Sequence, residues 1–245
     1  MSIPTQGPVA FSEIQAEFGG TNPISVSEYY LGGVNVPIGA NTDGIPESGA
    51  IAISEFRGKT PLGDVVYELI GGGGAGGFGR ADGGENYRGT FAQSGRDSTL
   101  SSSAFSEIVV PGGRGGENCK GARGSHGTNG GASFYGPGGR GGGENQNGSP
   151  APSGSYGAGG GGGGGDDGST FDSGGCSGEG GIASTRATGV LALRYGTEII
   201  VVVGSGAPYN NNNYDGGAGA RGYAVVDIDG TVTTYTTPNT YVLTV

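Results

Sequence analysis

The chain has few of the residues from which large cores and catalytic sites are built. Its 245 residues include no Trp, one His, one Met and two Cys, and only 33% are hydrophobic. Globular domains usually contain about 45–50% apolar residues with glycine included, so a large aliphatic core is not available here. Stability must depend on backbone hydrogen bonds and a few strands, because ordering 61 glycines costs much conformational entropy.

Positive charge is also scarce. The formal net charge is −10, and Lys59 and Lys120 are the only lysines. Nucleic-acid binding requires a basic surface, so neither DNA nor RNA is an expected partner. No apolar run approaches the ~18 residues of a membrane span, and we expect no membrane insertion. Residues 1–20 lack the basic and apolar regions of a Sec signal.

Groups suited to catalysis are few and poorly placed. The single histidine, His126, lies between glycines, which form a poor frame for a catalytic triad. Glycosidases use two catalytic carboxylates, and two pairs of aspartates in this sequence match them in residue type alone. Asp166 and Asp167 belong to a polar segment, and Asp227 and Asp229 lie at an expected hairpin turn, where Asp is common for local reasons. We therefore expect no enzyme activity.

The two cysteines, Cys119 and Cys176, are far apart in the sequence. They could form a disulfide, but one available pair is weak evidence for it. Together with His126 they lack the spacing of a zinc site. Neither of the two aspartate pairs has the ligand spacing of an EF-hand loop, so nothing in the sequence supports bound calcium. The sequence therefore predicts neither a metal nor a cofactor.

Glycine recurs with a period of three between Gly112 and Gly163. One phase of this stretch has 18 positions, and 14 of them are glycine. The same phase resumes at Gly175, Gly178 and Gly181. A period of three is typical of the extended left-handed helix with three residues per turn. Glycine in one phase gives such a helix a bare stripe on which neighbouring backbones can pack closely.

This periodicity predicts a bundle of polyglycine-II helices within one chain, in which backbone groups pair between helices. Collagen is excluded because only 12 residues are proline and the glycine phase is interrupted. The alternative is a disordered glycine-rich linker. The phase bias, the embedded aromatic residues and the flanking strand-like segments favour the folded arrangement.

Residues 1–62 have a different texture and contain a short repeat. The segment 3–14 aligns with 45–56, and a shorter copy spans 24–29. Each copy alternates apolar and small residues before reaching Ser-Glu, which predicts a short strand followed by a helical turn. A module of this size buries little surface alone, so we expect it to pack against copies of itself or a partner chain. A small self-contained cap is the alternative.

Helical turns are expected after each strand of the repeat. The serine of each Ser-Glu pair is a candidate N-cap, and Ser12 with Gln15 matches a capping box. Glutamate is favourable in the first turn. Gly19 and Gly32 are the expected ends of the first two helices.

After a boundary at 61–63, the remainder predicts strands around the glycine-rich region. Alternating or β-branched runs identify these strands as 65–70, 105–110, 190–193, 199–203, 223–228, 231–237 and 240–245. Asp229-Gly230 predicts a hairpin between two of them. Gly71, Gly73 and Gly76 match the dinucleotide-binding pattern, but no helix is expected after them, so the match is fortuitous. The expected fold is mainly β with polyglycine-II helices: residues 1–62 as a small module, then 63–245 as a glycine-rich β/polyglycine-II sandwich.

Two parts of the chain resemble bacteriophage tail proteins. The opening, Gly7-Pro-Val-Ala-Phe-Ser-Glu-Ile-Gln-Ala-Glu-Phe-Gly-Gly20 followed by Ile24-Ser-Val-Ser-Glu-Tyr-Tyr30, resembles a module widespread in tail and fibre proteins. The remainder resembles the glycine-rich phage domain through 65–77, 201–206 and 219–226. It is similar in style to T-even-like fibre-tip adhesins with a polyglycine-II sandwich, although the opening module differs from the attachment domain expected of those adhesins.

The resemblance implies a virion tail or tail-fibre tip protein, assembled in the host cytoplasm, that binds a host receptor without catalysis. The implied partners are other tail or fibre proteins and a host surface glycan or outer-membrane protein. Aromatic side chains in polar loops suit such recognition. The candidate receptor-binding residues are Tyr87, Phe91, Phe134, Tyr135, Tyr156, Phe171, Tyr209, Asn211, Asn212 and Tyr214, and the candidate virion-docking residues are Phe11, Ile14, Phe18, Tyr29, Tyr30, Ile53 and Phe56.

Three other functions fit the sequence less well. The first rival is a purely structural tail, collar or decoration protein without receptor contact. A surface-glycan depolymerase would require a cleft with two suitably spaced carboxylates. A free-standing ice-binding bundle disagrees with the tail-like opening. Fibre parts are commonly homotrimers, and the repeat in residues 1–60 suggests self-association, but a single copy on a trimeric stem is the alternative.

Overall fold

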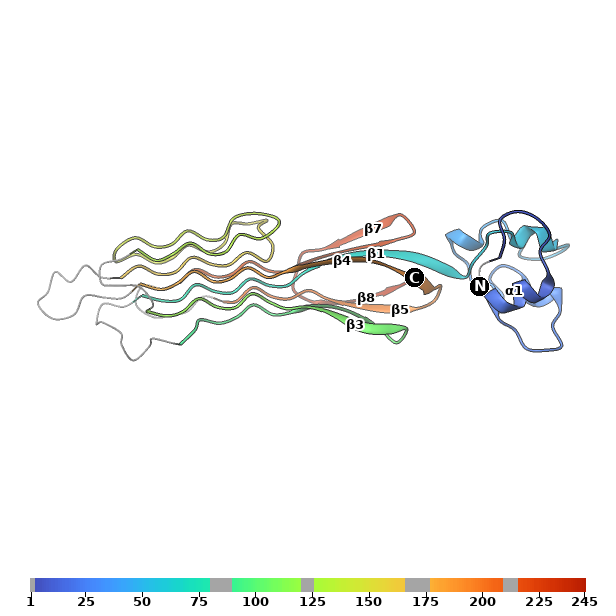
Figure 1. The fold of residues 1–245 in the computed structure, drawn as a ribbon, viewed down its shortest axis with the longest axis horizontal. Helices are drawn as coiled ribbons and strands as arrows, with labels where there is room; N and C mark the ends of the chain where they lie inside the picture. Colours follow the sequence, from blue (N-terminus) through green and yellow to red (C-terminus); the bar gives the residue numbers. More distant parts are fainter. Residues whose placement is uncertain (1–2, 80–89, 120–125, 166–176, 209–215) are drawn as a thin grey trace, which may run out of the picture.

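The computed structural model describes residues 3–79, 90–119, 126–165, 177–208 and 216–245. It is elongated, with a small helical module at one end, two antiparallel sheets in the middle, and glycine-rich segments at the other end (Figure 1). The described part is mainly β with few helices, as the sequence predicts.

Each sheet contains four strands. The first has the order β4-β1-β6-β7 and the second β3-β2-β5-β8, and all pairs are antiparallel. The strands are β1 (Leu62–Ile70), β2 (Ser98–Ser102), β3 (Phe105–Val110), β4 (Arg186–Arg194), β5 (Glu198–Val202), β6 (Tyr223–Ile228), β7 (Thr231–Tyr235) and β8 (Thr240–Thr244). All seven strands expected from the sequence are present, and β2, a serine-rich strand, is additional.

The two sheets share one apolar core. Alternate residues of a strand face opposite sides of its sheet, so the inner strands contribute every second side chain, whereas β7 contributes only Tyr235. Val65 and Leu69 of β1 and Ile199 and Val201 of β5 are fully buried in this way. The hairpin between β6 and β7 turns at Asp229 (φ 48°) and Gly230 (φ 86°), the positive angles that a tight two-residue turn requires.

The glycine-rich segments are joined by backbone hydrogen bonds that repeat every three residues. The segment 72–77 is the clearest case. Its N–H groups at 72 and 75 donate to 93–96, those at 73 and 76 to 217–220, and those at 74 and 77 to 179–182. Its carbonyls accept from three further segments, at 113–116, 160–163 and Ala207. This segment is buried throughout and therefore lies at the centre of the array.

Backbones in this array approach so closely that many of its glycines have no room for a side chain. A methyl group added at Gly73 would lie 1.9 Å from the carbonyl oxygen of Ala158, and one at Gly160 would lie 1.9 Å from that of Gly217. Contacts below 3.0 Å cannot be accommodated without moving the backbone. The glycine pattern is therefore a packing requirement of this part of the molecule.

The N-terminal module contains one α-helix and three 3-10 turns. These are α1 (Phe11–Phe18), η1 (Val26–Tyr29), η2 (Ala40–Thr42) and η3 (Ile53–Phe56). Its core is formed by Ile3, Ile14, Phe18, Tyr29, Val36, Ile45 and Phe56, all at most 3% exposed. The module therefore has a core of its own despite its small size, which agrees with the alternative of a small self-contained cap.

The sequence repeat corresponds to one structural unit used three times. In each copy the glutamate of Ser-Glu bonds back to the backbone N–H three residues earlier, at 2.7 Å for Glu13, 3.1 Å for Glu28 and 2.7 Å for Glu55. The residue after each glutamate, Ile14, Tyr29 or Phe56, is fully buried. Each repeat therefore supplies one cap and, directly after it, a buried core side chain.

The structure corrects three details predicted for this module. The apolar stretches before the turns are extended but form no named strand within residues 3–60. The N-caps of α1, η1 and η3 are Ala10, Ser25 and Ala52 rather than the serines of the Ser-Glu pairs, because in each copy the glutamate, and not Gln15 in the first, reaches back to the free N–H. The helix does end before Gly19, but η1 ends at Tyr29, short of Gly32.

Candidate functional site

A cluster of four aromatic rings lies where the glycine-rich region meets the first sheet. Phe134 and Tyr135 come from one turn, Tyr156 from a second turn, and Tyr223 from the start of β6. We call these rings, together with Glu68 of β1 and Arg186 of β4, the aromatic ledge. The ledge thus combines residues from five places in the sequence.

The four rings form a row in which each ring packs against the next. Tyr156 stacks on Tyr223 at 4.7 Å between centroids, Tyr135 lies 4.9 Å from Tyr223, and Phe134 meets Tyr135 edge to face at 5.3 Å. Such geometries are favourable for aromatic pairs. Phe134 is 68% exposed and Tyr135 37% exposed, whereas Tyr156 and Tyr223 are half-buried. The outer rings therefore present apolar surface to solvent on a base of packed rings.

A charged pair fixes the ledge to the sheet. Oε1 of Glu68 accepts hydrogen bonds from Nε of Arg186 at 2.6 Å and from the hydroxyl of Tyr135 at 3.0 Å. The guanidinium carbon of Arg186 also lies 4.1 Å from the ring centre of Phe134, a cation–π distance. Burial raises the pKa of Tyr135, and its contacts with Tyr223 and Glu68 raise it further. The hydrogen bond to Glu68 raises the pKa of Arg186.

Backbone contacts hold the two aromatic turns in place. The turn that contains Phe134 and Tyr135 closes through a 2.9 Å bond from the N–H of Ser133 to the carbonyl of Gly136. A side chain at Gly136 would meet the hydroxyl of Ser155 at 2.5 Å, so the two turns are in contact. Gly157, next to Tyr156, donates to Arg221 at 2.8 Å. The rings are therefore positioned by the scaffold before any partner binds.

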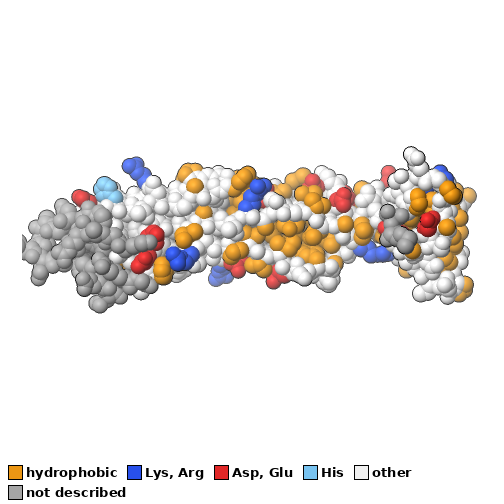
Figure 2. All heavy atoms as spheres, viewed as in Figure 1, with side chains coloured by type: hydrophobic (Ala, Val, Ile, Leu, Met, Phe, Trp, Pro, Cys, Tyr) orange, Lys and Arg blue, Asp and Glu red, His pale blue; other side chains and the backbone are white. Residues whose placement is uncertain are grey.

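The outward face of the first sheet continues from the ledge. Val190, Val66, Asp227 and Val232 form one row across β4, β1, β6 and β7. The three valines are 44–66% exposed. Oδ1 of Asp227 is buried and has no hydrogen-bond partner among the described residues. Hydrophobic side chains gather over the strand region in Figure 2, whereas the described glycine-rich part is mostly backbone and small polar groups.

The structure brings together three of the predicted receptor-binding residues, Phe134, Tyr135 and Tyr156. A fourth, Phe91, lies apart from the ledge, is 46% exposed and has the guanidinium of Arg114 4.5 Å from its ring centre. The remaining six, Tyr87, Phe171, Tyr209, Asn211, Asn212 and Tyr214, lie outside the described residues.

Sequence reasoning missed three members of the ledge, Glu68, Arg186 and Tyr223. Each lies in a strand, so its pattern in the sequence indicates only a sheet residue. Alternation along β1 places Glu68 on the outward face, opposite buried Leu69, and this was the one available signal.

The predicted virion-docking residues divide into two groups. Ile14, Phe18, Tyr29 and Phe56 belong to the module core and are at most 1% exposed, so they are not docking contacts in this structure. Phe11 and Tyr30 are half-buried and Ile53 is 38% exposed. Two side chains that the sequence did not indicate are more accessible, namely Val34 at 97% and Ile38 at 71% exposure.

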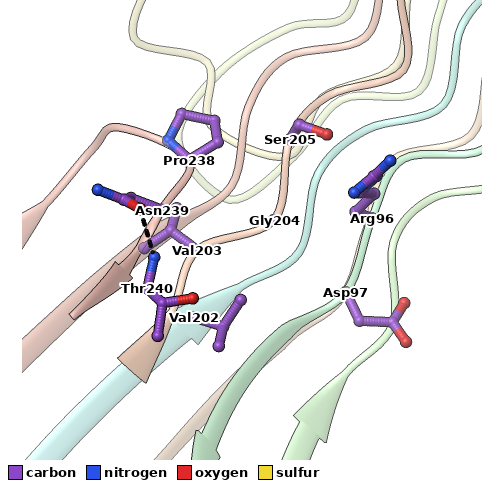
Figure 3. Close-up of a pocket in the computed structure, with 9 residues that line it drawn as sticks. All are labelled: Arg96, Asp97, Val202, Val203, Gly204, Ser205, Pro238, Asn239 and Thr240. Carbon is purple, nitrogen blue, oxygen red and sulfur yellow. Dashed lines mark hydrogen bonds between the residues drawn. The ribbon is translucent and has the colours of Figure 1, made fainter. Parts of the chain in front are cut away.

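Hollows of the described structure include one beside the sheets and one on the N-terminal module. One, of about 240 Å³, lies where β5 and β8 meet the glycine-rich region. Figure 3 shows Arg96 and Asp97 on one side of it and Pro238, Asn239 and Thr240 on the other. Asp97 accepts a hydrogen bond from the N–H of Gly112, and Asn239 accepts one from the N–H of Thr240. Both side chains are therefore already engaged in hydrogen bonds to the backbone. Its volume is below the ~300–1,000 Å³ typical of ligand pockets.

The second hollow, of about 630 Å³, lies on the N-terminal module. Gly20, Thr21, Ser27, Glu28, Gly33, Val34 and Asn35 line it. The carboxylate of Glu28 already accepts a hydrogen bond from the N–H of Ser25 as a helix cap. The main apolar side chain lining this hollow is the exposed Val34. This hollow is an accessible surface on the end of the molecule opposite the glycine-rich segments (Figure 1).

Among the other candidate groups, Asp229 stabilises the fold. Asp229 accepts hydrogen bonds through both carboxylate oxygens, from the N–H of Asp64 and the hydroxyl of Tyr195. His126 is exposed, and Cys119 is disulfide-bonded, while Cys176 lies outside the described residues. The described part of the chain contains no group of three or more His, Cys, Asp or Glu arranged to hold a metal ion. Nor does any helix within it have the length and hydrophobicity to cross a membrane.

Comparison with protein-family models found no match, and neither did the searches for similar curated proteins and for similar solved structures.

Proposed function

We propose that this chain is a bacteriophage tail or tail-fibre tip protein, an adhesin that recognises a host surface receptor through loops and aromatic residues on a glycine-rich scaffold. One observation carries the proposal. A module with its own core and a glycine-rich array occupy opposite ends of a rod. Hydrogen bonds of Tyr195 with Asn41 and of Arg194 with Phe18 fix the module to the sheets. Such a rod suits attachment at one end and presentation of loops at the other.

We propose further that the glycine-rich segments are polyglycine-II helices. The three-residue repeat in the hydrogen bonds of 72–77 supports this, since a helix of three residues per turn presents every third N–H to the same neighbour. A scaffold of this kind is held by backbone groups, so its loop sequences can vary without loss of the fold.

Residues 1–62 would attach the protein to other tail or fibre components, in the virion assembled in the host cytoplasm, and 63–245 would bind the receptor. Val34 and Ile38, together with Phe11, Tyr30 and Ile53, are the accessible apolar side chains that support attachment through the module. Neither catalysis nor a cofactor is part of the proposal.

Binding of the labelled full-length protein to a panel of bacterial strains tests this function. We expect saturable binding to a subset of strains. The double variant Tyr209→Ala/Tyr214→Ala should bind those strains more weakly, whereas Val34→Ser/Ile38→Ser should bind cells normally but fail to enter the assembled virion. If the folded protein binds no strain, it is a structural tail, collar or decoration component instead.

A further inference from the structure

We infer that the aromatic ledge on the side of the rod binds a neutral glycan. The inference rests on the proposed function, because it assigns the ligand class of a receptor-contacting surface. It goes beyond the proposed function by placing that surface beside the first sheet, where Phe134, Tyr135, Glu68 and Arg186 meet.

The exposed rings match the apolar faces of sugars. One face of a hexose ring carries mainly C–H groups, which are weakly positive, and an aromatic face is negative. Phe134 keeps 68% of its surface exposed although it is fully apolar and Tyr135 supports its edge. Because the ring is held by Tyr135 and Arg186, a ligand that stacks on it does not have to order it first.

The charged pair beside the rings matches sugar hydroxyls. A hydroxyl both donates and accepts hydrogen bonds, so a carboxylate next to a guanidinium can satisfy it in both directions. Glu68 uses Oε1 for both of its bonds, and within the described residues its Oε2 makes none. Arg186 uses Nε for Glu68, which leaves its terminal nitrogens as donors, and its side chain is 38% exposed.

The charges favour a neutral sugar over an acidic one. Glu68 and Arg186 neutralise each other at the ledge, whereas the chain as a whole carries −10. A glycan rich in carboxylate or phosphate would be repelled by this net charge. Four rings and one ion pair are also a small area compared with the ~800 Å² that each partner buries in a standard protein complex. A short stretch of hexose, deoxyhexose or N-acetylhexosamine units is the ligand of matching size.

The test uses the full-length chain on an array of neutral and acidic oligosaccharides, followed by NMR titration with the neutral ones that bind. We expect binding to neutral members in the millimolar range or tighter. Phe134→Ala should weaken it about tenfold, equal to ~1.4 kcal/mol, and Phe134→Tyr should restore it because the stacking face remains. Glu68→Gln should also weaken binding, and its folding is checked by thermal unfolding.

Val242→Ala is the control, since Val242 is likewise an exposed apolar side chain, 59% accessible, but lies on β8 of the second sheet and belongs to no proposed binding surface. It should leave glycan binding unchanged. The inference is overturned if no neutral glycan binds, if acidic members bind better, or if Val242→Ala weakens binding as much as Phe134→Ala.

The two proposals fail separately. If cells are bound in a way that depends on Phe134 while no glycan is, the protein is an adhesin for a protein receptor and the glycan inference is wrong. If neutral glycans bind at the ledge but no strain is bound, the ligand class stands and the adhesin function does not.

Discussion

The hydroxyl of Tyr195 donates a 2.7 Å hydrogen bond to Oδ2 of Asp229 and accepts a 3.0 Å bond from the N–H of Asn41. Asn41 belongs to the N-terminal module, whereas Tyr195 follows β4 and Asp229 lies in the β6–β7 turn. The ring of Tyr195 also fills the space beside Gly39, where an added methyl group would lie 2.2 Å from it. One tyrosine therefore joins the module to the first sheet.

The first prediction concerns this junction. Tyr195→Phe should destabilise the protein by about 1–3 kcal/mol, because it leaves a partly buried carboxylate oxygen and a backbone N–H without their partner. It should also loosen the module relative to the sheets, which small-angle scattering would detect as a change in maximum dimension. Tyr241→Phe is the control, since that hydroxyl makes one exposed bond to the carbonyl of Thr237. Equal losses of stability in the two variants would contradict the role given to Tyr195.

Alkaline pH should weaken the same junction. Burial raises the pKa of Tyr195, and Asp229 adds to this, while the bond from Asn41 opposes it. The unfolded chain then loses the phenolic proton first, near pH 10, and the folded chain only at higher pH. The stabilisation is therefore complete below about pH 10 and is lost as the pH rises through the folded pKa. Melting temperatures across this range should fall more steeply for the wild type than for Tyr195→Phe, and parallel curves would refute the prediction.

A single methyl group added at the centre of the glycine-rich array should lower the free energy of unfolding. Gly73→Ala places a methyl 1.9 Å from the carbonyl oxygen of Ala158, so the backbone must move. We expect a loss of about 3 kcal/mol or more in the free energy of unfolding. At Gly143 the nearest atom is Oε1 of the Gln146 side chain at 3.0 Å, which can move aside. Gly143→Ala should therefore change stability by less than ~1 kcal/mol, and equal effects in chemical denaturation would argue against close packing of the array.

The N-terminal module should depend on its own core. Phe56 is 1% exposed and contacts the rings of Phe18 and Tyr29, so Phe56→Ala should cost about 3–5 kcal/mol. Ile53, one turn earlier and 38% exposed, should cost less than ~1 kcal/mol when changed to Ala. Amide hydrogen exchange within residues 10–58 measures both effects. Similar protection in the two variants would show that the module is stabilised from outside.

The candidate site was only partly predictable from the sequence. Aromatic residues among glycines indicated Phe134, Tyr135 and Tyr156, because such side chains stand out against a background without other apolar groups. Glu68, Arg186 and Tyr223 did not stand out, since each fits the ordinary alternation of a strand. In residues 1–62 the apolar positions were recognised, but the periodicity could not separate buried Tyr29 from half-buried Tyr30.

The sequence by itself determined the local elements of this protein. Alternating apolar residues set seven strands, Asp229-Gly230 set the hairpin, and Glu13, Glu28 and Glu55 set three caps, because each depends on residues only a few positions apart. Only the tertiary structure decided which strands share a sheet and which residues form the aromatic ledge. Those depend on contacts between distant segments, such as the one between Glu68 and Tyr135, which are 67 positions apart in the sequence, and no local pattern carries information about such contacts.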